Sequence, residues 1–170
     1  MTQLDNPDTV GDETGFYVIR DVPVGRFNVY EVLQDGWLQT KPGGGTGYLI
    51  NVDDEVSELD FGNVKAGGIS GVKWNDVNAN GVFEPDTERE GSSEVGLAEW
   101  VIFIDLNRNG VFDSSLQQAG TEPYRITRAD DPETSVNEAG QYFFGNLLPG
   151  NYRVGEVLRD NWRQTWPGVK

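Results

Sequence analysis

The sequence contains no cysteine and no histidine in its 170 residues. The absence of cysteine excludes a disulfide framework and thiol chemistry, although it does not identify the redox compartment. The absence of histidine removes the commonest general base and the commonest ligand of transition metals. The Gly-x-Ser-x-Gly motif of a nucleophilic serine is also missing. We therefore expect no enzyme active site.

Basic residues and long apolar runs are scarce. Lysine and arginine number 13 against 28 acidic residues, for a net charge of −15, so no basic patch is available for nucleic acid or for an anionic membrane surface. No apolar run approaches the ~18 residues that a membrane helix requires, and the opening residues MTQLDNPDTV lack the regions of a secretion signal. The chain is either cytoplasmic or part of a longer secreted protein, and its natural counterpart is a cation.

The chain does contain an internal repeat. Residues 15–43 (GFYVIRDVPVGRFNVYEVLQDGWLQTKPG) align without a gap on residues 140–168, at an offset of 125. The identical pairs include Gly15/Gly140, Tyr17/Tyr142, Gly25/Gly150, Glu31/Glu156, Trp37/Trp162 and Pro42/Pro167. A repeat of this length is a whole domain rather than a solenoid unit. We predict two tandem units: residues 1–63 are the C-terminal part of one, and residues 64–170 are a second unit that lacks its last strands.

The secondary structure that the sequence predicts is almost entirely β. Short segments rich in β-branched and aromatic residues are bounded by Gly, Pro, Asn and Asp, which is typical of strands and turns. The predicted strands are 15–19, 26–33, 48–52, 59–62, 68–74, 100–106, 123–127, 141–144 and 152–158. No convincing helical period is present. Many short strands at regular spacing favour an all-β sandwich.

Two segments share one motif, DVNANGVFE at 76–84 and DLNRNGVFD at 105–113. Calcium binds six to eight oxygen ligands, which one loop supplies from alternate positions with a glycine at the sixth. The first loop offers Asp76, Asn78, Asn80, the Val82 carbonyl and Glu84, with Glu88 or Glu90 as a late acid. The second loop offers Asp105, Asn107, Asn109, the Val111 carbonyl, Asp113 and, as its late acid, Glu122. We predict two calcium (Ca²⁺) sites in loops that close strand ends.

An alternative interpretation is that Asn80-Gly81 and Asn109-Gly110 are two-residue hairpin turns, which favour Asn-Gly because both central residues need a positive φ. Turn chemistry does not explain the upstream Asp and Asn or the downstream acid in both copies. The flanking segments ISGVKW and WVIFI resemble strands, which excludes a helix–loop–helix calcium switch. Few formal charges in each loop predict weak sites, with a Kd of about 10⁻⁴ to 10⁻³ M. Such sites fill where calcium is abundant, so we expect an extracellular protein.

Taken together, these segments resemble the B-type domains of serine-aspartate repeat surface proteins, within the prealbumin-like, collagen-adhesin B-type group. The resemblance rests on GGISGVKWNDVNANGVFEPD, GLAEWVIFIDLNRNGVFD and EAGQYFFGNLLPGNYRVGEVL, and on YLINVDDEVSELDFGN in the other copy. It implies a Greek-key β-sandwich (immunoglobulin/prealbumin-like), stiffened by calcium and used in tandem on bacterial cell-surface or matrix proteins. The chain departs from the family at LQQAG, before Glu122, and at EPDTEREGSSE, which leaves open the acid that closes each loop.

Some members of this group join a lysine on the first strand to an asparagine on the last, using a buried acid that shuttles protons. The resemblance implies Lys73, Asn63 and Glu156 as the nearest counterparts here, with Glu31 in the partial copy. The alternative is a solvent-facing lysine, an asparagine at a strand end and an exposed glutamate.

The function that we expect from the sequence is a calcium-rigidified structural module of a surface, matrix or filament protein. Because each unit is incomplete, we expect neighbouring copies to complete each other, in tandem or head to tail, by strand addition. The alternative is an adhesin domain that binds a glycan or peptide through a strip of Trp37, Trp162 and Trp166. These tryptophans would otherwise cover the end of the core or an inter-domain joint.

Overall fold

The computed structural model describes residues 2–4, 7–8, 14–53, 55–85, 93–114 and 121–167. Within these residues the chain forms strands and a short 3₁₀ turn, Gly43–Gly45, with no α-helix. The strands are β1 (Gly25–Val29), β2 (Trp37–Lys41), β3 (Tyr48–Val52), β4 (Gly62–Lys65), β5 (Gly67–Val72), β6 (Val101–Ile104), β7 (Tyr124–Ile126), β8 (Gln141–Leu147) and β9 (Val154–Glu156). The expectation of an all-β chain is therefore confirmed.

The chain divides into two compact units. Unit 1 comprises residues 1–34 and 39–63, and unit 2 comprises residues 35–38 and 64–170. In unit 1, β1 and β3 form an antiparallel pair, with Phe27 opposite Ile50. Strands β2 and β4 also pair with each other, and residues 39–41 and 62–63 of this pair belong to unit 1. No described residue of unit 1 is buried, so this unit has no closed core of its own within the described residues.

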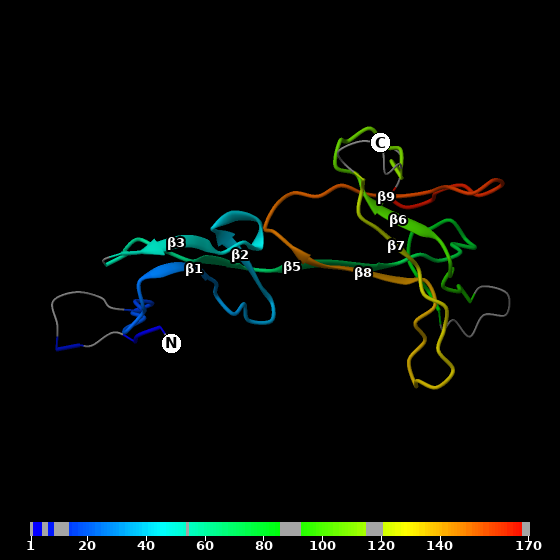
Figure 1. The fold of residues 1–170 in the computed structure, drawn as a ribbon. Coiled ribbons are helices and arrows are strands. Elements are labelled where there is room, and N and C mark those ends of the chain that lie inside the picture. Colours follow the sequence, from blue (N-terminus) through cyan, green and yellow to red (C-terminus); the bar gives the residue numbers. More distant parts are fainter. Residues whose placement is uncertain are drawn as a thin grey trace. The chain divides into compact units, whose positions relative to one another are not determined.

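Unit 2 holds the buried core. Its β5 and β8 run side by side as an antiparallel pair, and β6 lies between β7 and β9 in a three-stranded antiparallel sheet (Figure 1). The unbroken apolar run Val101–Ile104 fits its surroundings, because Ile102, Phe103 and Ile104 are all buried and successive strand residues point to opposite faces of the sheet. Ile102, Ile104 and Phe144 pack together in the core. The candidate loops follow strands of different sheets: Asp105 comes directly after β6, and Asp76 lies a short way beyond the end of β5.

Three strand predictions are corrected by the structure. Residues 15–19 were expected to form a strand but form none. Their repeat counterparts lie in β8, which pairs with β5, and a strand persists only where a partner satisfies its backbone N–H and C=O groups. Conversely, β2 was not predicted, because WLQTK does not alternate; pairing with β4 makes it a strand. The last strand of unit 1 was expected at 59–62 and is found at Gly62–Lys65.

No helix in the described part of the chain is long and apolar enough to cross a membrane.

Candidate functional site

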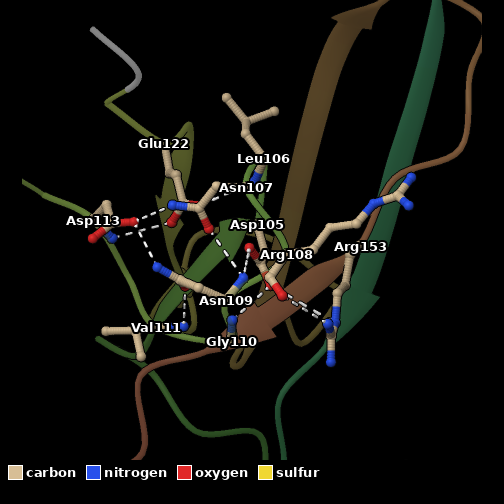
Figure 2. A network of polar contacts seen from close by, with 10 residues as sticks. All are labelled: Asp105, Leu106, Asn107, Arg108, Asn109, Gly110, Val111, Asp113, Glu122 and Arg153. Carbon is tan, nitrogen blue, oxygen red and sulfur yellow. Dashed lines mark hydrogen bonds and ion pairs between the residues drawn. The ribbon is translucent and has the colours of Figure 1, made fainter. Parts of the chain in front are cut away.

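The second loop begins where β6 ends, at Asp105. This residue is 4% exposed, and its carboxylate folds back over the loop. Oδ1 accepts a hydrogen bond from the backbone N–H of Asn109 at 3.1 Å, and Oδ2 accepts one from Gly110 at 3.0 Å (Figure 2). The Asp105 carboxylate therefore closes a turn of six residues, from Asp105 to Gly110.

Two asparagines continue the network along the second loop. Asn107 Oδ1 accepts the N–H of Asn109 at 3.0 Å, and Asn109 Oδ1 accepts the N–H of Val111 at 2.7 Å. The amide nitrogens of both asparagines donate to the same oxygen, Oδ2 of Asp113, at 2.6 and 3.0 Å. The side chains of Asn107 and Asn109 thus both reach toward Asp113 (Figure 2).

Glu122 joins the two ends of the second loop. Its Oε1 accepts the N–H of Leu106 at 2.9 Å, and its Oε2 accepts the N–H of Asp113 at 3.1 Å. The residue is 1% exposed. A buried carboxylate with two main-chain donors holds the first and last parts of the loop at a set separation.

The first loop repeats this network with the same geometry. Asp76 accepts the N–H of Asn80 at 3.1 Å and that of Gly81 at 3.0 Å. Asn78 Oδ1 accepts the N–H of Asn80 at 2.9 Å, and Asn80 Oδ1 accepts the N–H of Val82 at 2.7 Å. The amide nitrogens of Asn78 and Asn80 both donate to Glu84 Oε2, at 2.8 and 3.0 Å. The two loops are therefore structural copies.

The acid that closes the first loop is Glu94, which the sequence interpretation missed. Its Oε1 accepts the N–H of Val77 and its Oε2 accepts the N–H of Glu84, both at 3.1 Å, and the residue is 1% exposed. Glu94 lies 10 residues after Glu84, and Glu122 lies 9 residues after Asp113. This similar spacing, which differs by one residue, was the available signal in the sequence. The proposed late acid Glu88 lies outside the described residues.

The hairpin-turn alternative is wrong for both motifs. A two-residue turn of the expected type needs a positive φ at the asparagine and at the glycine. The residues with positive φ are instead Ala79 and Gly81 in the first loop, at 56° and 74°, and Arg108 and Gly110 in the second, at 62° and 75°. The intervening asparagines are not among the positive-φ residues. The motif encodes a wrapped loop rather than a tight hairpin.

The pKa of Asp76 reflects its surroundings in the loop. Desolvation raises this pKa, but a hydrogen bond from the Thr165 side chain and bonds from the backbone N–H groups of Gly81, Asn80 and Ala79 outweigh it, so the pKa lies below its ordinary value. These donors favour the ionised carboxylate. Thr165 belongs to the repeat copy at the end of unit 2, so this contact connects the loop to a distant part of the unit.

The donor set fits a hard divalent cation. Each loop brings together carboxylate and amide oxygens, the ligand type that calcium prefers. Within the described residues, no three His, Cys, Asp or Glu side chains are grouped so that they could hold a metal ion. Asparagine and main-chain oxygens, including the Val82 and Val111 carbonyls of the predicted ligand set, would therefore have to complete any site. A softer metal that prefers sulfur or imidazole does not fit these loops.

The residues considered for a cross-link form two separate pairs. Lys73 Nζ lies 2.8 Å from Glu156 Oε2, with side chains 16% and 10% exposed, so the alternative of a solvent-facing lysine and an exposed glutamate is wrong. In unit 1, Asn63 Nδ2 donates to Glu31 Oε2 at 2.8 Å. The other oxygen, Glu31 Oε1, is buried and lacks a hydrogen-bond partner within the described residues.

The tryptophans have different surroundings. Trp162 packs edge-on against the buried Trp100, with ring centroids 5.3 Å apart, and so covers one end of the core. Trp166 is 62% exposed and lies over the first loop, where a Cβ at Gly81 would come within 3.2 Å of its ring. Trp37 is 41% exposed. Within unit 2, Trp162 is therefore a core contact, as the interpretation as a core cover predicts, and Trp166 is a loop contact.

Comparison with known proteins finds no match: neither a family model, nor a curated protein, nor a solved structure is significantly similar to this chain.

Proposed function

We propose that this chain is a calcium-stabilised structural module of a bacterial extracellular surface, matrix or filament protein, built from Greek-key β-sandwich units in tandem, with a mechanical rather than a catalytic role. The observation that supports calcium most strongly is the duplicated loop network, in which each loop ends on a buried glutamate. Glu94 and Glu122 are each 1% exposed, and within the described residues no ion pair reaches either one.

Burial of an unpaired carboxylate is costly, because the charge loses its hydration without gaining an opposite charge. Main-chain N–H groups offset only part of that loss. A structure that places this arrangement twice, beside further carboxylates and asparagines, is well suited to a cation. The net charge of −15 adds a long-range attraction for cations that is independent of the loops.

The residues that would hold calcium are those already described in the two loops. They are Asp76, Asn78, Asn80, Val82, Glu84 and Glu94 in the first loop, and Asp105, Asn107, Asn109, Val111, Asp113 and Glu122 in the second. Bound calcium supplies a divalent positive charge. The chain itself contributes the closed loop, in which the first Asp and the last Glu accept hydrogen bonds from main-chain N–H groups of the loop.

The test of calcium binding is a thermal melt of the full chain. At a calcium concentration 100 times Kd, each filled site should add about 2.7 kcal/mol to the free energy of unfolding. Asp105→Asn and Asp76→Asn should each remove part of this gain, whereas Asp160→Asn, an exposed acid outside the loops, should not. A melting curve that is the same in millimolar calcium and in chelator would refute the calcium proposal.

Assembly with neighbouring copies is supported by the unequal pairing of the two repeat copies. In unit 2, β8 pairs with β5, but its counterpart in unit 1 forms no strand and leaves Phe16, Val18 and Ile19 more than 60% exposed. Strand β2 pairs with β4, but its repeat counterpart 162–166 forms no strand. We propose that copies of the module supply these missing partners, in tandem or head to tail, by strand addition.

The test of assembly combines sedimentation with amide hydrogen exchange over a range of protein concentrations. Association should slow exchange selectively at residues 16–22 and 162–166, because these backbones gain strand partners. A chain that remains monomeric at high concentration, with unchanged exchange in both segments, would contradict assembly through these edges and leave the calcium proposal standing.

A further inference from the structure

The two loops share one internal network but differ in what contacts their first aspartate from outside. At the second loop, Arg153 Nε lies 3.7 Å from Asp105 Oδ2, with the arginine side chain 61% exposed and the aspartate side chain 1% exposed. At the first loop, the corresponding contact comes from the neutral side chain of Thr165. One loop therefore has a resident cation beside its first carboxylate, and the other has a hydrogen-bond donor without charge.

The loop sequences increase this difference. The fourth position is Arg108 in the second loop and Ala79 in the first. Arg153 Nη1 also donates to the Arg108 carbonyl oxygen at 3.4 Å, so Arg153 contacts the second loop at two points (Figure 2). Within the described part of the chain, no ion pair joins a lysine or arginine to a carboxylate of the first loop.

The position of Arg153 follows from the sheet. Val154, the first residue of β9, lies opposite Ile104, the last residue of β6. The next backbone hydrogen bond, from Asp105 N to Arg153 O at 2.8 Å, holds the two main chains together. The register therefore places the arginine beside the aspartate, while its largely exposed side chain remains free to turn into solvent.

We propose that Arg153 is a built-in counter-ion of Asp105 whose positive charge opposes calcium, so that the second loop binds calcium more weakly than the first. The inference rests on the proposed calcium function and adds an order of filling: the first loop, which contacts Thr165, fills before the second. Coulomb repulsion between a divalent ion and a guanidinium about 5 Å away, reduced by salt, weakens binding roughly three- to tenfold. The module would therefore stiffen in two steps as calcium rises.

The test is calorimetric titration of the full chain with calcium chloride, one loop at a time. Asp105→Asn disables the second loop, so that only the first binds calcium, and Asp76→Asn does the reverse. We expect the second loop to bind calcium roughly three- to tenfold more weakly than the first. In the Asp76→Asn background, Arg153→Gln should tighten calcium binding by the second loop by a similar factor. Arg153→Lys retains the positive charge and should not tighten it. Added to Asp105→Asn, Arg153→Gln should leave binding unchanged. Arg163→Gln, at an exposed position outside the loops, is the control for net charge.

Equal affinities of the two loops, or no tightening by Arg153→Gln, would overturn the role of Arg153 while leaving the calcium function intact. Absence of calcium binding at both loops would overturn both proposals. A measurement without metal tests the role of Arg153 independently of calcium binding. In chelator, Arg153→Gln should lower the melting temperature relative to Arg163→Gln, because Asp105 loses its cation. Identical melting temperatures for these two variants would show that Arg153 is not the counter-ion of Asp105.

Discussion

The ammonium group of Lys73 lies 2.8 Å from Glu156 Oε2 and 4.5 Å from the centroid of the Trp100 ring. Lys73 follows β5, and Glu156 ends β9, so the pair joins the two sheets of unit 2. Both side chains are largely shielded from water, at 16% and 10% exposure. The aromatic face and the carboxylate together replace the hydration that the ammonium loses.

Removal of either partner of the Lys73–Glu156 pair should lower the free energy of unfolding. Lys73→Met should destabilise the protein by about 2 to 4 kcal/mol, because Glu156 would keep a charge without a partner in a largely buried site. The double variant Lys73→Met with Glu156→Met should lose less than the sum of the single variants. Urea unfolding of the full double-mutant cycle measures the coupling energy. Lys41 and Asp60 provide a control, since they lie 2.8 Å apart with side chains 57% and 67% exposed, and should show almost no coupling.

Glu94 rather than Glu88 should prove to be the acid that closes the first loop. Glu94→Gln keeps one acceptor oxygen but presents an amide to the N–H of Val77 or of Glu84, so it should destabilise the protein by about 1 to 3 kcal/mol in chelator. It should also weaken calcium binding by the first loop. Glu88→Gln should change neither quantity. The reverse ranking, in urea unfolding and calcium titration of both variants, would assign the role to Glu88.

Replacement of the loop glycines by alanine should have unequal effects. Gly110 has a φ of 75° and open space around it, so Gly110→Ala should cost about 1 to 2 kcal/mol from left-handed strain alone. Gly81 has a φ of 74° and would also place its Cβ 3.2 Å from the Trp166 ring, so Gly81→Ala should cost more. Gly67→Ala is the control, because its φ is not positive and its Cβ would meet only an ordinary contact at 3.6 Å. Equal losses for the two loop variants, from unfolding curves in chelator, would contradict the Trp166 contact.

Calcium should change the side-chain amides of the loop asparagines. In both loops two asparagine Nδ2 groups donate to a single carboxylate oxygen, on Glu84 or on Asp113. A cation bound at that oxygen would displace these N–H groups, because positive partial charge and a cation repel each other. The side-chain amide resonances of all four asparagines should therefore shift on calcium addition. The amide of Gln141, which donates to the Asn137 carbonyl at 3.1 Å, should not shift; movement of this resonance alone would place calcium elsewhere.

The sequence by itself determined the internal wrapping of both loops. The bonds that form them join residues only two to six positions apart, such as Asn109 with Asp105 and Asn107 with Asp113. Contacts over so short a span depend on residue type and spacing, and the chain repeats both. The same holds for the strand content, since β3 lies at the predicted residues 48–52. Apolar patterning and turn residues are sufficient for such local structure.

Only the tertiary structure decided which distant residues complete the loops. Glu94 contacts Val77 across 17 positions, and Arg153 reaches Asp105 because β9 pairs with β6. These contacts depend on strand register and on the path of the intervening chain, and neither is encoded in the loop motifs. Pairing also decided which strands exist: similar repeat sequences form β8 beside β5 and no strand at residues 15–19. A strand requires a partner for its backbone hydrogen bonds, and the partner is a property of the fold.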